Sequence, residues 1–463
     1  MTLSVTQTLT AALEEARART RLLGRPVLAS LSEPITRLDP LAIFAAAQAA
    51  GLDSSFWQQP AGGFALVGVG EAVALEPSGA GRIQAARDAW RELLADALVA
   101  GDEGAGPALL GGFAFDPERP RSELWRGFPG TRLVLPRLLY SVTLAGCWRT
   151  TSLLVDRATD VADEERRLAA ESALLERADA APNAAPNPAR QVEARPGAAW
   201  RGAVARGVAA IRAGELEKVV LARAVLLEAE RAFAAPAALA RLAVAYPSCT
   251  VFAFGRAGRT FLGATPERLA RLEDGVLRTA ALAGSAPRGA TPEEDARLGQ
   301  GLLASAKDRG EHAIVVRALT DGLEGICDEL TMPGEPALLS VANIHHLHTP
   351  VSGRLEPGKT LLDAVERLHP TPAVGGWPRA AALRFIREQE GLDRGWYAAP
   401  LGWLDRHGAG EFAVGLRSAL LEGSTAALFA GCGIVGDSDP AEEYAESRLK
   451  LRPMLAALTG CAR

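Results

Sequence analysis

The sequence lacks several features that would point to particular classes of protein. It contains no basic block, since 50 lysines and arginines stand against 55 aspartates and glutamates, for a formal net charge of −5. Binding of nucleic acid through phosphate contacts is therefore not expected. No stretch reaches the roughly 18 unbroken apolar residues of a membrane span. The amino-terminal segment also lacks the basic-then-apolar order of a signal peptide.

Cysteine and histidine are unevenly used. The five cysteines are scattered, odd in number and free of any C-x-x-C pair. This usage favours a reduced, cytoplasmic setting. The first 300 residues contain no histidine, and all six histidines lie between His312 and His407. Any histidine chemistry therefore belongs to the second half.

The organisation indicates one large α+β unit or two to three average domains. Residues 181–199, rich in Ala, Pro and Asn, cannot hold a helix or a central strand and are expected to connect residues 1–180 with residues 200–458. Long strands in succession predict antiparallel sheets with helices outside. Among them, residues 132–156 are expected to form one long β-hairpin and residues 337–355 one strand.

The segment GCGIVGDSDPAEEYAESRLK, residues 431–450, predicts a glycine-rich strand that turns into a helix capped by Asp439. Glu443, Glu446 and Lys450 fall at spacings of three and four and should share one helix face. Two interpretations remain open at this point. The face is either a solvated one with an ordinary salt bridge, or a site for magnesium and an anion.

Two further residues could supply acid–base chemistry. Lys218 opens an apolar strand, where lysine often only blunts a sheet edge. In a desolvated pocket, however, a lysine can serve as a general base. Glu267 follows the turn GATPE and is either a solvated turn carboxylate or the acid that faces Lys218 across a pocket.

Candidate metal ligands come from two places. Glu311 lies where a helix changes from charged to apolar and could join Glu443 and Glu446 in an oxygen-ligand set suited to Mg²⁺. The string IHHLHTP could instead contribute two histidines of one strand face to a zinc site, although a hydrogen-bonding role for His346 is favoured. Arg417 is expected at a strand or loop position, and an arginine within an apolar strand needs an anionic partner such as a substrate carboxylate.

The segments discussed above belong to a series of short sequence strings, given at the end of this paragraph. In order along the chain, these strings resemble the signature of the chorismate-utilising enzymes, and most closely that of the isochorismate synthases. The resemblance is strong over about residues 200–458 and weaker before. The strings are KVVLAR, ATPERL, TAALAGSAPRG, S-x-K-D-R-x-E-H, HHLHT, LHPTPAVGG, GWYAAPLGW, GEFAVGLRSAL and GCGIVGDSDPAEE, with FWQQPAGGFALVGVG, GGFAFDP and LPRLLYS in the first half.

The resemblance implies a single α+β unit of the anthranilate synthase component I type. Residues 1–180 would be its divergent amino-terminal half and residues 200–458 its chorismate-binding catalytic region. Lys218 would activate water and Glu267 would act as acid. Magnesium would be held by Glu311, Glu446 and Glu443, and chorismate by residues matching Gly284, His346, Tyr397, Arg417, Gly433 and Lys450.

The resemblance further implies an isomerase that converts chorismate to isochorismate for menaquinone or siderophore synthesis. Lys218 favours water as nucleophile, because the ammonia-using anthranilate and aminodeoxychorismate synthases lack this lysine; no glutaminase subunit is expected, and the chain should be a monomer or weak dimer. The alternatives are a salicylate synthase, which goes on to eliminate pyruvate, and a non-catalytic zinc- or anion-binding protein. Cys432, Ser285 and Ala399 depart from the usual alanine, threonine and glycine.

Overall fold

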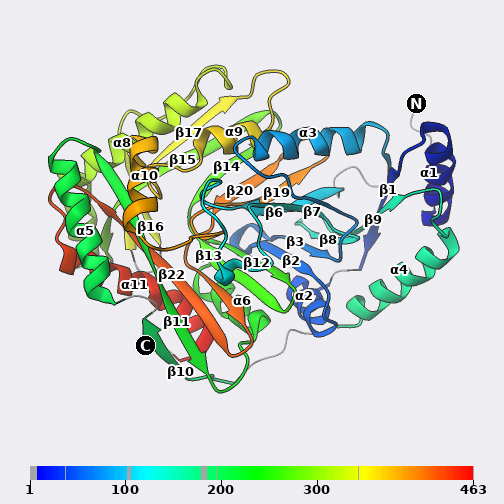
Figure 1. Ribbon diagram of the computed structural model, residues 1–463, viewed down its shortest axis with the longest axis horizontal. Helices are drawn as coiled ribbons and strands as arrows, with labels where there is room; N and C mark the ends of the chain where they lie inside the picture. The colour runs from blue at the N-terminus through cyan, green and yellow to red at the C-terminus, as the bar shows by residue number, and fades with distance from the viewer. Residues whose placement is uncertain are drawn as a thin grey trace.

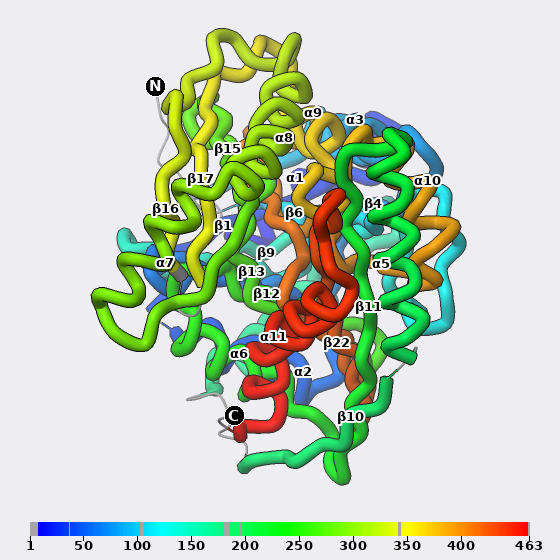
Figure 2. The backbone as a smooth tube through the Cα atoms, turned by 90° about the vertical axis from the view of Figure 1, so that its left-hand side faces the viewer, coloured from blue at the N-terminus to red at the C-terminus, as the bar shows by residue number. Residues whose placement is uncertain are grey.

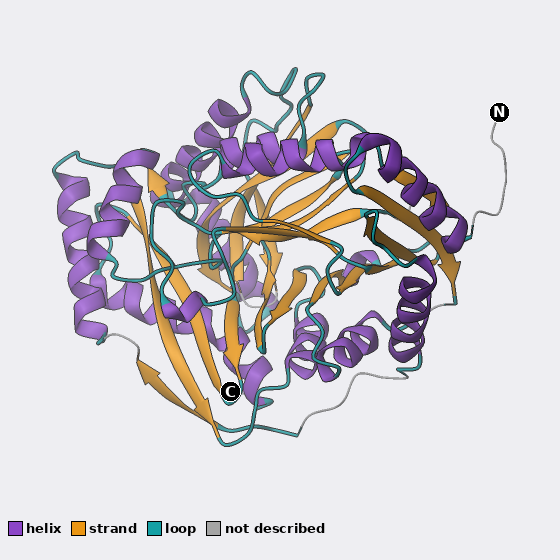
Figure 3. Cartoon of the chain, turned by 45° about the vertical axis from the view of Figure 1, so that its right-hand side comes forward, coloured by secondary structure: helices purple, strands orange, loops and turns teal. Residues whose placement is uncertain are grey.

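The computed structural model describes residues 8–36, 38–101, 106–178, 185–193, 196–341 and 344–461. Its described strands form two large sheets, and helices surround them (Figure 3). None of the described helices is both long enough and apolar enough to cross a bilayer.

The larger sheet has 13 described strands and mixes both halves of the chain. Its path starts with β10 (Ala189–Glu193), β11 (Lys218–Ala229), β22 (Thr425–Ile434), β21 (Ser418–Glu422), β13 (Arg259–Thr265) and β12 (Thr250–Arg256). It continues with β2 (Ser54–Gln59), β3 (Phe64–Val69), β8 (Leu138–Val142), β9 (Cys147–Val155), β1 (Val27–Ile35) and β5 (Leu98–Gly101), and β18 (Gly376–Trp377) pairs with β11.

The smaller sheet has nine described strands and also joins the two halves. Its order is β16 (Ala337–Val341), β17 (Ile344–Arg354), β15 (Val276–Pro287), β14 (Arg268–Glu273), β20 (Gly410–Val414), β19 (Pro400–Asp405), β6 (Ala108–Phe113), β7 (Thr131–Leu135) and β4 (Val73–Leu75). Of the pairings between these strands in both sheets, that of β1 with β5 is parallel and the others are antiparallel.

Helices lie around the two sheets (Figure 1). They are α1 (Leu9–Leu23), α2 (Pro40–Ala49), α3 (Arg82–Ala95), α4 (Val161–Glu176), α5 (Gly197–Arg212), α6 (Ala235–Ala245), α7 (Pro292–Ala304), α8 (Ala306–Leu323), α9 (Leu361–Leu368), α10 (Arg379–Gln389) and α11 (Pro440–Thr459), with short 3₁₀ turns η1 (Pro60–Gly62) and η2 (Glu123–Trp125). Helix α11 packs against β22 and α5 (Figure 2).

The main core is shared by the two sheets, because one cluster of buried side chains includes Trp57 and Phe261 of the larger sheet and Leu110 and Phe412 of the smaller one. A second cluster lies under α2, α6 and α11 on the larger sheet. The α+β architecture of large antiparallel sheets with outer helices is thus confirmed.

Two expectations about strands were wrong in detail. Residues 132–156 do not form one hairpin: β7 belongs to the smaller sheet, whereas β8 and β9 pair in the larger one. Residues 337–355 do not form one strand, since β16 pairs antiparallel with β17, with Ser340 opposite His345. In both cases an apolar run contains a change of direction that alternation alone does not reveal.

The expected connection at residues 181–199 is partly regular. Residues 189–193 form β10, an edge strand on β11, and α5 begins at Gly197. Residues 181–184, 194 and 195 lie outside the described part of the chain. An edge strand is compatible with the expectation, which excluded a central strand. The expectation that this segment holds no helix is wrong at its end, because α5 already includes residues 197–199.

Candidate active site

Lys218 is a buried residue rather than a strand-edge charge. It begins β11, its side chain is only 1% exposed, and its Nζ donates to Glu311 Oε1 of α8 at 2.6 Å. Burial alone would raise the pKa of Glu311, but the charge and the hydrogen bond of Lys218, together with the charges of Lys450 and Lys307, lower it below its ordinary value. The apolar sequence after Lys218 forms β11, the second strand of the larger sheet, and its residues from Lys218 to Val225 are all buried.

A glycine on the neighbouring strand leaves room for this pair. Gly433 of β22 lies in register with Val220 of β11. A Cβ at Gly433 would lie 3.0 Å from Lys218 Cε and 3.2 Å from Glu311 Oε1. A larger residue would therefore push the lysine and the carboxylate apart.

Glu267 is a carboxyl group whose pKa lies close to neutral pH. It lies in the link between β13 and β14, where its backbone N–H donates to Thr265 Oγ1 and its C=O accepts from Val414 N. Burial raises the pKa of Glu267 to about 7, although the charges of Lys218 and Lys450 act in the opposite direction. A carboxyl with such a pKa retains its proton near pH 7 often enough to act as a general acid.

Helix α11 begins as predicted and brings two carboxylates together. Asp439 caps it by accepting from Ala441 N and Glu442 N, with Pro440 at the first position. Oxygens of Glu443 and Glu446 and the Sγ of Cys432 lie within 4.8 Å of one another. Within the described residues this is the one group of three metal-ligand side chains at such distances.

The donor chemistry of this group fits a hard cation. Burial raises the pKa of Glu443 and the neighbouring Glu446 carboxylate adds to the rise, whereas the Ser438 hydroxyl, which donates to Glu443 Oε1 at 2.7 Å, lowers it. Two half-buried carboxylates that repel each other are suited to Mg²⁺. Glu311, the third predicted ligand, contacts Lys218 instead, so a cation would have to share this carboxylate with the lysine.

Lys450 connects α11 with the glycine strand. Its Nζ contacts Glu446 Oε1 at 2.6 Å and donates to the C=O of Gly431 at 3.2 Å. The predicted i,i+4 salt bridge is therefore present, with the Lys450 and Glu446 side chains 32% and 43% exposed, and Lys450 also reaches the strand. The bridge agrees with the interpretation as a partly solvated face, and the carboxylates beside it leave the interpretation as a metal site open.

Arg417 has unused hydrogen-bonding capacity. It lies between β20 and β21 with a positive φ of 46°, and its Nη1 is buried with no hydrogen-bond partner in the described part of the protein. A buried guanidinium nitrogen without a partner is costly unless an anion completes it. Tyr397, also predicted to bind substrate, is buried and stacks on Phe429.

His346 presents a second polar atom without a partner. Its Nδ1 lies 2.8 Å from Ser285 Oγ and 3.3 Å from the C=O of Gly284, whereas its Nε2 is buried and unpaired among the described residues. Burial lowers the pKa of His346 to about 4, with added effects from Arg417 and Lys450. The imidazole is thus neutral. Gly284 has a φ of +75°, which favours glycine at this position inside β15, where the pairing with β17 shifts register.

The alternative zinc site receives no support. His345 contacts Ser340 Oγ through Nδ1 and Asp295 Oδ1 through Nε2, so both ring nitrogens are used. His346 has the hydrogen-bonding role favoured from the sequence. Residues 342 and 343, just before this string, lie outside the described residues.

Sequence reasoning missed two contributors to the site. Ser438, one residue before the helix cap, orients Glu443, and Cys432 places its sulfur beside both α11 carboxylates. A hydroxyl immediately before the capping residue was the available signal for Ser438. Ser285 retains a hydroxyl contact despite departing from the usual threonine.

Comparison with known proteins decides the family. A sequence model described as "Chorismate binding enzyme" matches residues 11–459. The chain belongs to this family of chorismate-binding enzymes. Within the family, it is 40% identical over 457 residues to the "Salicylate biosynthesis isochorismate synthase" of Pseudomonas aeruginosa, covering 96% of this chain and 93% of the relative. It is 36% identical to "Isochorismate synthase MenF" of Bacillus subtilis, covering 94% of each chain.

A solved family structure has the same fold over almost the whole length. The menaquinone-specific isochorismate synthase MenF from Escherichia coli superposes with a TM-score of 0.80 at 27% identity, covering 97% of this chain and 99% of that chain. The family resemblance and the fold expected from the sequence are therefore confirmed.

Proposed function

We propose that the protein is an isochorismate synthase, which adds water at C2 of chorismate and removes the C4 hydroxyl. The observation that carries the proposal is the buried Lys218, 1% exposed, in a site that also contains Glu267 with a pKa of about 7. One group can accept a proton and the other can donate one. The relatives whose names include isochorismate synthase support this activity.

The two residues would divide the proton transfers. Lys218 Nζ takes a proton from the water that attacks C2, a step for which the amine must first be unprotonated. Glu267 gives its proton to the departing C4 hydroxyl, which leaves as water while the ring double bonds shift. Atoms balance because one water enters and one leaves. Acid–base catalysis of this kind typically contributes about 10² to 10⁴ in rate.

Mg²⁺ is the cofactor we assign to the carboxylates of Glu443, Glu446 and Glu311. When bound, it would neutralise the ring carboxylate of chorismate. The carboxylate chemistry of α11 supports this choice over a softer metal at the histidine string. Cys432 lies beside two of these ligands but is a poor donor to magnesium.

Substrate binding would use the unpaired groups around the site. The free Nη1 of Arg417 can donate to a substrate oxygen, whereas the free Nε2 of the neutral His346, whose Nδ1 contacts the C=O of Gly284, can accept from a substrate hydroxyl. Tyr397, Lys450 and the backbone near Gly284 and Gly433 complete this set. Because Glu443, Glu446 and Lys450 come from one helix, metal and substrate sites would be held together.

Water, rather than ammonia, is the proposed nucleophile, and so no glutaminase subunit is required. We expect a cytoplasmic monomer or weak dimer. The product could enter a menaquinone or a siderophore route, and named relatives include both a menaquinone-specific and a vibriobactin-specific isochorismate synthase.

The test is to incubate the purified protein with chorismate, with and without Mg²⁺, resolve the products by chromatography and assay pyruvate. The proposal predicts isochorismate only with Mg²⁺ and without pyruvate. Salicylate together with pyruvate would identify a salicylate synthase instead. Unchanged chorismate would overturn the assignment.

A further inference from the structure

A buried ion pair lies directly against the strand that carries Lys218. Glu390, at the end of α10, and Arg394, in the turn after it, have side chains that are 0% and 2% exposed. Arg394 Nε donates to Glu390 Oε1 at 2.8 Å and Nη2 to Glu390 Oε2 at 2.5 Å. Such a pair is normally costly to bury, so its other contacts indicate its role.

Those contacts fill a gap at the edge of β11. On this side, β18 pairs with Lys218 and Val219, and β10 begins pairing only at Val225. No described strand covers the backbone between them. Here Glu390 Oε2 accepts from Ala222 N at 2.8 Å, and Arg394 Nη2 donates to the C=O of Val220 at 2.7 Å. The pair therefore takes the place of the missing strand.

The same arginine reaches the segment on the other side of Lys218. Its Nη1 donates to the C=O of Val374 at 2.8 Å, and the next residue, Gly375, accepts from Val220 N. A Cβ at Gly376 would lie 2.3 Å from the C=O of Lys218, so this segment packs directly on the lysine's backbone. Arg394 thus connects Val220, two residues after Lys218 in β11, with Val374, which precedes the segment packed on the backbone of Lys218.

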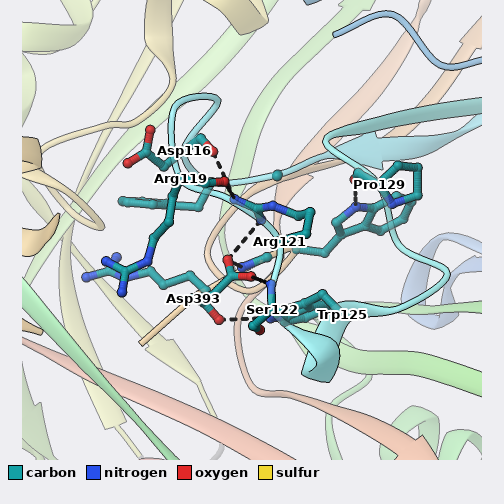
Figure 4. Close-up of polar contacts among 12 residues, drawn as sticks. Asp116, Arg119, Arg121, Ser122, Trp125, Pro129 and Asp393 are labelled. Atoms are coloured by element: carbon teal, nitrogen blue, oxygen red, sulfur yellow. Dashed lines mark hydrogen bonds and ion pairs between the residues drawn. The ribbon is translucent and has the colours of Figure 1, made fainter. Parts of the chain in front are cut away.

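The turn itself is anchored by the amino-terminal half. Asp393 accepts from Ser122 N at 2.7 Å and contacts Arg121 Nη1 at 3.0 Å, and its C=O accepts from Trp125 Nε1 at 2.9 Å (Figure 4). Arg394 therefore lies between the amino-terminal half, which holds the adjacent Asp393, and β11, to which its own side chain donates. Its rigid placement allows it to fix the backbone of β11 next to Lys218.

We infer that Glu390 and Arg394 are positioning residues for Lys218, which set the place of the base without contacting the substrate. The inference rests on the proposed function, because it assumes that Lys218 is the base. Arg394 is specific in this role, since a lysine cannot donate at once to Glu390, Val220 and Val374 in the planar geometry of guanidinium.

The test compares R394K and the double variant E390L/R394M with wild type. The double variant removes both charges together, so that neither is left buried alone, and it also removes the hydrogen bonds to the backbone of Ala222, Val220 and Val374. We expect kcat to fall by about 10²-fold, as for a displaced catalytic group. KM for chorismate should change less than kcat. Tyr397, one of the groups assigned to the substrate, does contact Arg394, but its backbone N–H donates to the C=O of Arg394 at 2.8 Å, a group that both variants keep. Hydrogen exchange at the amide of Ala222 should become faster in both variants.

R387K is the matched control, since Arg387 lies on α10 and pairs with Asp116 without touching β11. Its kcat and its exchange at Ala222 should stay at wild-type values. Folded R394K or E390L/R394M with wild-type kcat would overturn the inference, as would an equal loss in R387K. K218A and wild type, assayed in parallel, separate the proposals. Chorismate left unchanged by wild type refutes the proposed function, and full activity of K218A refutes the role of Lys218 as the base. An inactive K218A beside an active double variant refutes the positioning role alone.

Discussion

Individual residues at this site are placed at some cost to stability. Glu267 has its pKa raised by burial, and Arg417 keeps a buried nitrogen without a partner among the described residues. Neither the buried Glu267 carboxyl nor the unpaired Arg417 nitrogen lowers the free energy of the folded state. Both become useful when a substrate supplies a leaving hydroxyl and a carboxylate.

Glu267→Gln should therefore stabilise the protein while removing activity. The folded-state pKa of Glu267 is about 7, against an ordinary 4.5. Below pH 4.5 the group is protonated whether the chain is folded or unfolded. As pH rises through this window, only the unfolded chain ionises freely, so wild type loses stability until about pH 7. At pH 8 the variant should be more stable by about 1 to 3 kcal/mol.

Urea unfolding at pH 4 and pH 8 measures this effect, and the two proteins should differ only at the higher pH. The variant should also lose about 10² to 10⁴ in kcat, because glutamine cannot donate the proton. An equal stability difference at both pH values would contradict the pKa assignment.

Arg417→Ala should weaken substrate binding. If the free Nη1 meets a chorismate carboxylate, its removal should raise KM by about 10- to 100-fold, the usual range for a hydrogen bond to a charged group. Steady-state kinetics give the value, and R91A, at an exposed arginine of α3, is the control. An unchanged KM would place the carboxylate elsewhere.

At the scale of elements, α11 carries several of the side chains that we assign to metal and substrate binding. One helix carries Glu443, Glu446 and Lys450, and its start is fixed by Asp439 and by Ser438. The cap, the first proline and the shared helix face could all be predicted from local spacing. The pairing of Glu311 with Lys218 could not, because 93 residues separate them and only the packing of α8 against the sheet brings them together.

Ser438→Ala tests the element's role in metal binding. Without the hydroxyl, Glu443 loses its orienting hydrogen bond, and the Mg²⁺ affinity should fall by about 10- to 100-fold, as is typical for partners of metal ligands. Isothermal titration with Mg²⁺ measures the change. Ser78→Ala, at an exposed serine, should bind like wild type. Equal affinity of S438A and wild type would remove Glu443 from the ligand set.

At the scale of the whole molecule, the two halves form shared sheets. β2 of the first half pairs with β12 of the second, and β6 pairs with β19. The sequence predicted antiparallel sheets but not these partners, since period-two alternation fixes which face is buried and not which strand lies alongside. The same limitation hid the division of residues 132–156 between the sheets.

Separating the halves should therefore prevent folding. Residues 200–463 expressed alone would expose the edges of β12 and β19, and should be aggregated or unfolded by circular dichroism. The intact chain should unfold in one transition seen equally by circular dichroism and tryptophan fluorescence. A soluble, folded carboxy-terminal fragment would instead support two independent domains.

The most direct test of the account is the turnover of chorismate by Lys218→Ala in the presence of Mg²⁺. Removing the amine should abolish isochorismate formation, while Mg²⁺ still binds, because Glu443 and Glu446 are unchanged and Glu311, which loses its contact with Lys218, stays available to the cation. Turnover near the wild-type rate by the alanine variant would contradict the assignment of Lys218 as the base.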